Sequence, residues 1–391
     1  MKIAFIGQKG LPAVTGGVET HVERLALGLN REGHNVFVYA RSWYVARRRR
    51  TYQGVNLIFK PSIKTKNLDT ITHVFFASID AVRRHFDIIH YHGVGPALLA
   101  WIPRIFSPRS RVIITFHSID RHHGKWGSLA RFFLLLGEWC AVHFAHETIT
   151  VSKYLQRYTQ KRYGRKTIYI PNGVDANKLI PASEITRRFG LVKNNYILFL
   201  SRLIKHKGAH YLIEAYQKLY PTKKLVIAGD SSFTDKYVRR LRNLAESNPN
   251  IIFTGGVQKN SRLWAELYSN AYLFVLPSDS EGLPIVVLEA MSFGRCCLVS
   301  DIPQNMEAVA GGFGFHFRRG RVFSLQQKLK YLLTHPGLVD RVGRAAAGHV
   351  LVDYNWTDIV KAVDFVYSCA LESGKAHSIS ACLRSSLARN K

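Results

Sequence analysis

Two glutamates carry the clearest chemical signal in this chain of 391 residues. Glu281 lies in a polar stretch at 278–284 that reads SDSEGLP, and Glu289 follows eight positions later. Apolar residues surround Glu289 at nearly every helical position, so the pattern predicts that this carboxylate is carried inward on a buried helix. A buried carboxylate is costly unless hydroxyls or cations meet it. We therefore expect polar partners beside Glu289.

The elements that position these glutamates can be predicted from the flanking residues. An apolar run at 271–276 predicts a strand, so the glutamates belong to a strand, loop and helix unit. Pro284 suits the first helical position, and Gly294 suits the end of the helix. Glu281 then lies in the loop, close to the helix N-terminus. That arrangement is favourable for holding phosphate because the N–H groups there are unpaired and the dipole end is positive.

A basic pair follows another predicted strand, at 196–200. Arg202 and Lys207 are five positions apart, across a strand-to-helix turn that leads into a predicted helix at about 209–219. Both cationic groups can therefore reach one anion lying at the start of that helix.

These motifs resemble the retaining glycosyltransferases of family 4, the glycosyl transferases group 1. The likeness rests on the E-x7-E spacing of Glu281 and Glu289, within the surrounding PSDSEGLP and LEAM. The resemblance implies that Glu281 lies near the donor sugar and that Glu289 hydrogen-bonds the nucleotide ribose. It implies that Arg202 and Lys207 hold the donor diphosphate of a hexosyltransferase, which uses no cofactor besides its nucleotide-sugar substrate. We also expect no divalent metal, because the chain offers only Asp279-Ser280-Glu281 in place of an Asp-x-Asp pair.

Five further positions match donor-binding motifs of that family. Gly16 and Gly17 follow the first predicted strand and resemble a Gly-Gly pair that lets the backbone approach the donor diphosphate. Val257 marks the place where family members bind the base, mostly through backbone. Gly282 and Leu283 lie between the two glutamates and complete the expected donor-binding set.

Histidines at or near strand ends are the remaining candidates. His117 follows the predicted strand 112–116, at a carboxyl end where ligands bind in open α/β sheets. The resemblance implies that His117 lies beside the donor sugar. The acceptor-side candidates are His90, His92, His122 and His123, the last two near Lys125 and Trp126; their simpler interpretation is loop histidines.

Strand-like and helix-like runs alternate along the chain, which predicts an α/β protein with doubly wound sheets. The resemblance implies the GT-B fold, with two Rossmann-like domains facing across a cleft. We expect an acceptor-binding domain at 1–172 and a nucleotide-sugar-binding domain at 190–352, joined by the hinge-like PNGVD at 171–175. A helix at 355–370 is expected to cross back to the first domain. A basic, disordered tail is expected at 373–391.

Composition limits the class of protein. The main candidate for a membrane span, 132–136, is broken at once by Gly137 and Glu138, and no apolar run approaches the length that a spanning helix needs. Only four apolar residues follow Lys2 before Gly7, too few for a signal peptide, and we expect a cytoplasmic protein. The five cysteines show no metal-binding spacing, and we expect Cys296 and Cys297 to be reduced. No metal ligands are predicted.

The formal net charge of +29 calls for an anionic partner. The segment 33–68 has eight Lys or Arg and no acid, with Trp43, Tyr44 and Tyr52 alongside its run of four arginines at 47–50. Basic residues also occur in the tail, at 375, 384, 389 and 391. Because such charges bind anionic lipid, we expect peripheral membrane binding on the inner face and a lipid-linked or cell-surface glycan acceptor. The simpler interpretation of the segment is a solvated basic loop.

Other functions remain open at this level. The charge also suits a nucleic-acid-binding protein, although no RRM, KH or zinc-finger module is present. A GT-B-shaped epimerase or non-catalytic homologue would share the fold. A dinucleotide oxidoreductase is disfavoured, because Gly7, Gly10, Gly16 and Gly17 do not fit G-x-G-x-x-G and Arg41, not an acid, ends the second strand. The sequence does not identify the nucleotide, the sugar or the acceptor.

Overall fold

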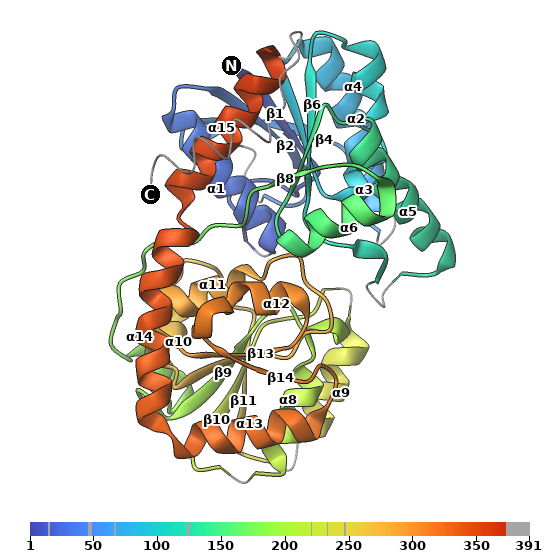
Figure 1. Ribbon diagram of the computed structural model, residues 1–391. Helices are drawn as coiled ribbons and strands as arrows, with labels where there is room; N and C mark the ends of the chain where they lie inside the picture. The colour runs from blue at the N-terminus through green and yellow to red at the C-terminus, as the bar shows by residue number, and fades with distance from the viewer. Residues whose placement is uncertain are drawn as a thin grey trace. The chain divides into compact units, whose positions relative to one another are not determined.

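The computed structural model describes residues 1–14, 16–45, 49–65, 68–122, 126–219, 221–232, 234–245 and 248–372. The chain forms two compact α/β units (Figure 1). Unit 1 comprises Met1–Asn172 together with the chain from Trp356 onward, and unit 2 comprises Gly173–Asn355.

Unit 1 is built on an eight-stranded sheet whose strands are parallel except for the short edge strand β3, which runs antiparallel to β4. Apolar runs form the central strands, and all five residues of β5 are buried. Strands buried on both faces are typical of a sheet covered by helices on both sides. In sheet order the strands are β3 (Thr51–Tyr52), β4 (Val55–Lys60), β2 (Asn35–Arg41), β1 (Lys2–Ile6), β5 (Ile88–His92), β6 (Arg111–Phe116), β7 (Glu147–Thr150) and β8 (Ile168–Tyr169).

Helices cover both faces of this sheet. The first and last helices pack together on one face, where a Cβ on Gly28 would lie 2.3 Å from Val360. Val363 and Tyr367 of the last helix join the same buried core. The helices are α1 (Gly17–Arg31), α2 (Leu68–Arg84), α3 (Val94–Ala97), α4 (Trp101–Phe106), the 3-10 turn η1 (Asp120–His122), α5 (Ser128–His143), α6 (Lys153–Tyr163) and α15 (Trp356–Glu372).

Unit 2 repeats the design with a six-stranded, wholly parallel sheet. Its strands, in sheet order, are β11 (Ile251–Gly255), β10 (Lys224–Ala228), β9 (Tyr196–Leu200), β12 (Leu273–Leu276), β13 (Cys297–Ser300) and β14 (Phe315–Phe317). Its helices are α7 (Glu184–Phe189), η2 (Lys205–Lys207), α8 (Ala209–Gln217), α9 (Asp235–Ala245), α10 (Arg262–Asn270), α11 (Ile285–Ser292), α12 (Pro303–Ala308), η3 (Ala310–Gly312), α13 (Val322–Thr334) and α14 (Pro336–Asp353). Two Rossmann-like units of this kind confirm the predicted α/β class.

The aromatic side chains of the basic segment 33–68 are bound to their own unit. The Trp43 indole N–H donates to Ser62 and Asp69 at 3.1 and 3.0 Å, and the Tyr52 hydroxyl donates to Glu23 at 2.9 Å. The Tyr44 hydroxyl accepts the backbone N–H of Val14 at 2.8 Å. All three side chains are half-buried and hydrogen-bonded within unit 1, and membrane binding by this segment stays a prediction.

The cations of this segment are also partly neutralised, since Arg41 and Lys60 pair with Asp69 and Asp80 of α2. Arg47, Arg48, Lys66 and the basic tail at 373–391 lie outside the described residues, as do His123 and Lys125. Cys140, Cys296 and Cys297 are free thiols, as expected for 296 and 297. No helix in the described part of the chain is long and apolar enough to cross a bilayer.

Candidate active site

Two loops of unit 2 meet at the carboxyl ends of neighbouring strands β9 and β12. The Asp279 N–H, in the loop after β12, donates to the His206 carbonyl in the loop after β9, at 2.7 Å. Gly208 has φ of 74°, and a Cβ there would lie 1.9 Å from the Pro277 carbonyl oxygen. A side chain at 208 would therefore separate the loops, because both its conformation and the space are restricted to glycine.

This approach brings Lys207 and Glu281 into direct contact. The Lys207 Nζ donates to both carboxylate oxygens of Glu281, at 2.6 and 2.7 Å. Both residues are buried, with exposed fractions of 9% and 8%. Burial lowers the pKa of the Lys207 ammonium and the Glu281 charge opposes this, while the nearby Arg202 guanidinium lowers it further. The Arg202 guanidinium therefore lies close enough to Lys207 for its charge to lower the pKa of the ammonium.

The loop that carries Glu281 is held in place from the neighbouring strand. The Ser300 hydroxyl, at the end of β13, donates to the Ser278 carbonyl. The Asn305 amide donates to the Ser278 and Ser300 hydroxyls at 3.3 and 2.9 Å. Because all three residues are fully buried, their hydrogen bonds fix the start of the loop.

Glu289 lies on α11 with only 4% of its surface exposed. Lys259 Nζ lies 2.6 Å from its Oε1, and the Tyr268 hydroxyl donates to its Oε2 at 3.4 Å. The expected polar partners are thus present. No sequence motif identified Lys259, although it follows the predicted base position Val257 by two residues.

The helix that carries Glu289 starts one residue later than predicted. Pro284 precedes it in an extended conformation, with φ −76° and ψ 103°, and the helix begins at Ile285. The ring of Pro284 still fixes the entry to the helix. Gly294 adopts φ of 69° just after the helix, which confirms it as the stop.

Unit 1 contributes a cluster of three buried histidines, His21, His92 and His117. His92 Nδ1 lies 3.3 Å from His117 Nε2, and the His21 and His117 ring centroids are 4.8 Å apart. His21 Nδ1 lies 2.9 Å from the Asn172 side-chain oxygen, which indicates that Nδ1 donates and that Nε2 offers its lone pair to the cluster. His21 was not a candidate in the sequence, because it lies within a helical run rather than at a strand end.

Burial keeps these histidines neutral. It lowers the pKa of His21 to about 4, with the hydrogen bond to Asn172 opposing the shift. Burial also lowers the pKa of His92 and of His117 well below the usual value, and the neighbouring histidines add to the effect. Their ligand atoms lie within 4.8 Å of one another, the only such His, Cys, Asp or Glu group among the described residues. Neutral imidazoles of this kind can hydrogen-bond a sugar or hold a zinc-like ion.

The other histidine candidates are not members of this cluster, although the His90 ring packs on His92 with centroids 4.2 Å apart. His90 is fully buried on β5, where its nitrogens meet the Tyr367 and Thr115 hydroxyls at 2.6 and 2.7 Å. That is the geometry of a histidine packed in the core. Neither His90 nor His92 lies in a loop, because both belong to β5. His122 is exposed in η1.

The predicted glycine positions lie where the chain turns toward helices. Gly16 has φ of 110° and precedes α1, which begins at Gly17, and a Cβ on Gly16 would lie 2.2 Å from the Glu19 carboxylate. Only a residue without a side chain fits this approach. Val257 lies in the loop after β11, and Gly282 and Leu283 are buried between Glu281 and α11.

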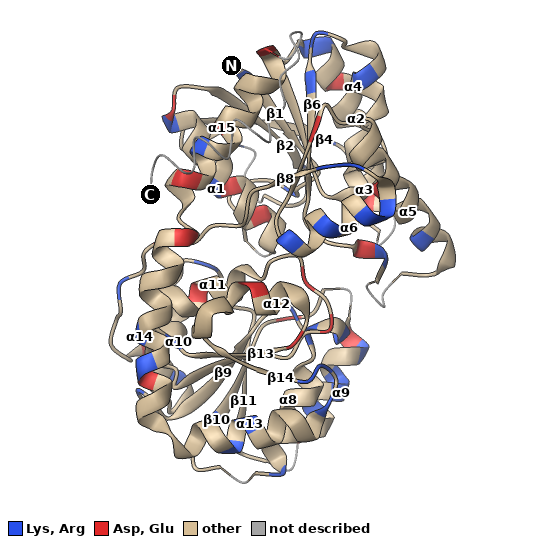
Figure 2. Ribbon diagram, in the orientation of Figure 1, with Lys and Arg blue, Asp and Glu red and all other residues tan. Residues whose placement is uncertain are grey.

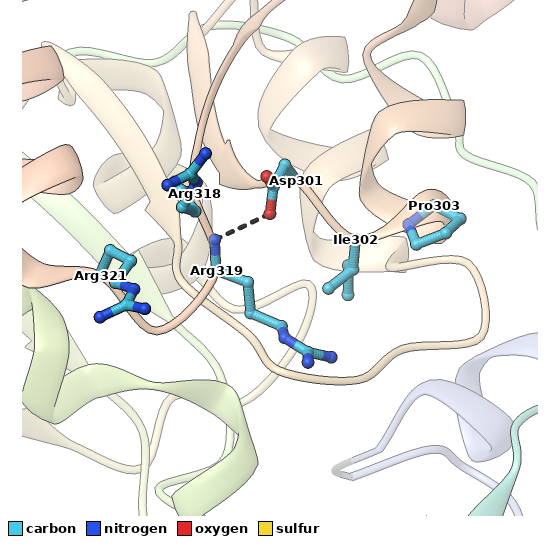
Figure 3. Close-up of a pocket in the computed structure, with 6 residues that line it drawn as sticks. All are labelled: Asp301, Ile302, Pro303, Arg318, Arg319 and Arg321. Atoms are coloured by element: carbon cyan, nitrogen blue, oxygen red, sulfur yellow. Dashed lines mark hydrogen bonds between the residues drawn. The ribbon is translucent and has the colours of Figure 1, made fainter.

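A basic pocket lies at the ends of β13 and β14, lined by Asp301, Ile302, Pro303, Arg318, Arg319 and Arg321 (Figure 3). The Asp301 carboxylate accepts the Arg319 backbone N–H at 2.8 Å. The Arg319 guanidinium donates to the Asp279 carbonyl at 3.4 Å, which links this pocket to the Glu281 loop. Arg319 thus adds positive charge near the candidate donor-binding residues. No sequence motif identified it.

Comparison with known proteins identifies the family. Residues 15–178 match the model for Glycosyltransferase Family 4, and residues 183–349 match that for Glycosyl transferases group 1. An uncharacterized glycosyltransferase of Methanocaldococcus jannaschii is 27% identical over 400 aligned positions, covering 95% of this chain and 99% of the relative.

Solved structures share the fold. Sucrose-phosphate synthase from Thermosynechococcus elongatus superposes with a TM-score of 0.81 at 20% identity, covering 95% of this chain and 99% of that one. Anabaena HepE in complex with UDP-glucose gives 0.77 at 21% identity, with 94% and 99% covered. The alternatives of a nucleic-acid-binding protein or an epimerase gain no support from these comparisons. The chain belongs to the group 1, family 4 glycosyltransferases and has the GT-B fold.

Proposed function

We propose that this glycosyltransferase moves a hexose from a nucleotide-sugar donor to an acceptor hydroxyl with retention of anomeric configuration. The acceptor is a lipid-linked or cell-surface glycan precursor, and the enzyme works at the inner face of a membrane without a divalent metal. The observation that carries the proposal is the buried Lys207–Glu281 pair in the loop before α11, together with the Glu289–Lys259 pair on that helix.

The Lys207–Glu281 pair suits a sugar diphosphate. Glu281 can accept hydrogen bonds from sugar hydroxyls, while Lys207 and Arg202 face the diphosphate that leaves. Preorganised positive charge at a leaving group is usually the largest single contribution to such catalysis. Because Lys207 already neutralises Glu281, we assign Glu281 to the sugar as an acceptor of hydrogen bonds and not as a covalent nucleophile. His117 is its proposed counterpart from unit 1.

The Glu289–Lys259 pair suits the nucleoside. A carboxylate held by Lys259 and Tyr268 presents fixed oxygens to a ribose diol, and Val257 lies nearby in sequence for the base. The Anabaena structure with UDP-glucose supports a nucleotide-sugar donor, since it has the same fold.

The same residues support the proposal that no metal is needed. A metal-dependent transferase typically offers an Asp-x-Asp pair to a cation. In this chain the second acid of that spacing is Glu281, two positions after Asp279, and its carboxylate already accepts hydrogen bonds from Lys207. Burial raises the pKa of Asp279, which makes it a poorer ligand for a hard cation. We assign the neutralisation of the leaving group to Lys207 and Arg202.

The proposal is tested by thermal stabilisation with UDP, GDP, dTDP and ADP and their sugars. One nucleotide series should stabilise the protein, by roughly 2.7 kcal/mol at a hundred times its dissociation constant. The matching sugar nucleotide should be hydrolysed slowly when no acceptor is present. Stabilisation by none of the four series, with salt-sensitive binding to random oligonucleotides instead, would contradict the proposal.

A further inference from the structure

Helix α5 presents apolar side chains outward. Its exposed residues recur at helical spacing, so they form one stripe, here called the α5 face: Leu129, Phe132, Phe133, Leu136 and Trp139. Phe132 is 54% exposed, whereas Glu138 on the opposite side is fully buried. A surface helix normally has the reverse arrangement. Figure 2 shows how little charge α5 carries, with Arg131 and Glu138 as its charged residues.

The orientation of α5 is fixed by its buried side. Glu138 accepts hydrogen bonds from Arg121 at 3.1 Å, Tyr158 at 2.7 Å and Tyr163 at 2.8 Å. A Cβ on the adjacent Gly137 would lie 2.2 Å from the Val94 carbonyl oxygen, so the helix backbone packs closely on α3. Turning the apolar stripe inward would expose this network and break the close packing. The outward α5 face is therefore a property of the native fold.

Neighbouring helices extend the apolar surface. Trp101, Ile105 and Phe106 of α4 are exposed, as are Phe75 and Phe76 of α2. Helix α4 packs against α2, and α5 packs against α3, along the same side of the unit 1 sheet (Figure 1). Exposed apolar residues so numerous on one side of a unit indicate an interaction surface.

Positive charge accompanies these apolar residues. A pocket lined by Arg121, His122 and Arg131 opens at the N-terminal end of α5; the Arg121 guanidinium is paired with Glu138, so Arg131 is the cation that the pocket offers. The chain from 88 to 119, which includes α3 and α4, contains Arg104, Arg109 and Arg111 and no acid. Aromatic rings beside arginines complement an anionic bilayer, where rings enter the acyl boundary and cations meet phosphate.

We propose that the α5 face is the surface by which this protein lies on an anionic lipid bilayer, with the Arg121, His122 and Arg131 pocket taking a lipid phosphate. The inference deepens the membrane association of the proposed function. It also moves the contact from the basic segment 33–68, whose rings are bound to their own unit, to α5. The protein would lie on the membrane without spanning it.

The apolar part of the proposal is tested by cosedimentation of the full-length protein with vesicles of phosphatidylcholine and phosphatidylglycerol. The double substitution Phe132→Ser and Phe133→Ser should lower partitioning at least about tenfold, because two rings no longer leave water. The matched control is Phe323→Ser on α13 of unit 2, which removes a phenylalanine that is 70% exposed. This control should bind as the wild type does.

The contribution of positive charge to membrane binding is tested with a second variant and its matched control. Arg131→Gln should weaken binding about fivefold on anionic vesicles and leave the weak binding to pure phosphatidylcholine unchanged. Arg341→Gln, at an exposed arginine of α14 in unit 2, should have no effect. Raising the salt concentration should reduce the difference between wild type and Arg131→Gln, because screening weakens the lipid contact.

Several results would overturn the proposal. One is a wild-type protein that fails to sediment with anionic vesicles at low salt. Another is equal loss of binding in Phe323→Ser and in the α5 variant. A third is a change of oligomeric state by light scattering in the α5 variant without any vesicle binding, which would make the α5 face a protein interface. Donor hydrolysis should be normal in every variant, so failure here is separable from failure of the proposed reaction.

Discussion

Replacing Lys207 with methionine should lower turnover by about 10²–10³, by analogy with the loss of one oxyanion donor. Lys207 is the proposed fixed charge at the leaving diphosphate, and a buried ammonium acts there without screening by water. Wild-type activity should persist in excess EDTA. The variant should not recover when magnesium is added, because no metal site takes the place of the ammonium.

Lys207→Met also breaks a buried ion pair, which can destabilise a protein by about 3–5 kcal/mol. The matched control is Arg262→Met, which removes a cation from the fully buried Glu266 elsewhere in unit 2. Turnover should be measured well below the melting temperature of each variant. A comparable loss of activity in Arg262→Met would show that the lower turnover of Lys207→Met results from lower stability. Loss of wild-type activity in EDTA, with recovery in metal, would contradict the proposed leaving-group site.

Restoration by zinc but not magnesium would point instead to the cluster of His21, His92 and His117, whose nitrogens lie within 4.8 Å of one another. Zinc prefers imidazole nitrogen, whereas magnesium prefers oxygen ligands. Comparing the two metals therefore separates a cation at the histidines from a cation at Asp279.

Glu289→Gln should weaken nucleotide binding about 10- to 100-fold, while Glu281→Gln should mainly lower turnover. Glu289 is assigned to a contact with the ribose, and that contact exists before the reaction. A hydrogen bond to a charged group contributes about 1.5–3 kcal/mol to binding, which gives the expected loss of affinity. Glu281 is assigned to the sugar that changes, so its contribution should be largest in the transition state.

The measurements are the dissociation constant of the nucleoside diphosphate by calorimetry and turnover with saturating donor. Lys259→Met is a useful companion, because it leaves the Glu289 carboxylate in place without its cation. It should weaken nucleotide binding less than Glu289→Gln does. Equal losses of nucleotide affinity in the Glu281 and Glu289 variants would contradict the division of roles.

The sequence predicted the elements well where a run of apolar residues had to be buried. The strand at 196–200 is β9 with the same bounds, and the predicted strand at 112–116 lies within β6. Short edge strands were not predicted, because the two residues of β3 and of β8 are too few to show a pattern. The GT-B assignment came from motifs rather than from periodicity, since alternating strands and helices fit many doubly wound folds.

The contacts of the candidate site were harder to predict. Lys207 and Glu281 are 74 positions apart, and their contact depends on the close approach of Gly208 to Pro277. Lys259 resembles any surface lysine in the sequence. The exposure of the apolar side of α5 was not predicted either. The run 132–136 was interpreted only as a candidate membrane span, with Glu138 as a break in it. Which side of such a helix is buried depends on Tyr158 and Tyr163, two partners that lie on the following helix.

The most direct test of the central claim follows the anomeric proton by NMR while the purified enzyme consumes the sugar nucleotide that stabilises it most. An α-linked donor should give an initial product with the α configuration, in EDTA as well as in magnesium. The rate should fall at least about a hundredfold in Glu281→Gln and in Lys207→Met. A β-configured initial product, or an unchanged rate in both variants, would contradict retaining transfer at the Lys207–Glu281 site.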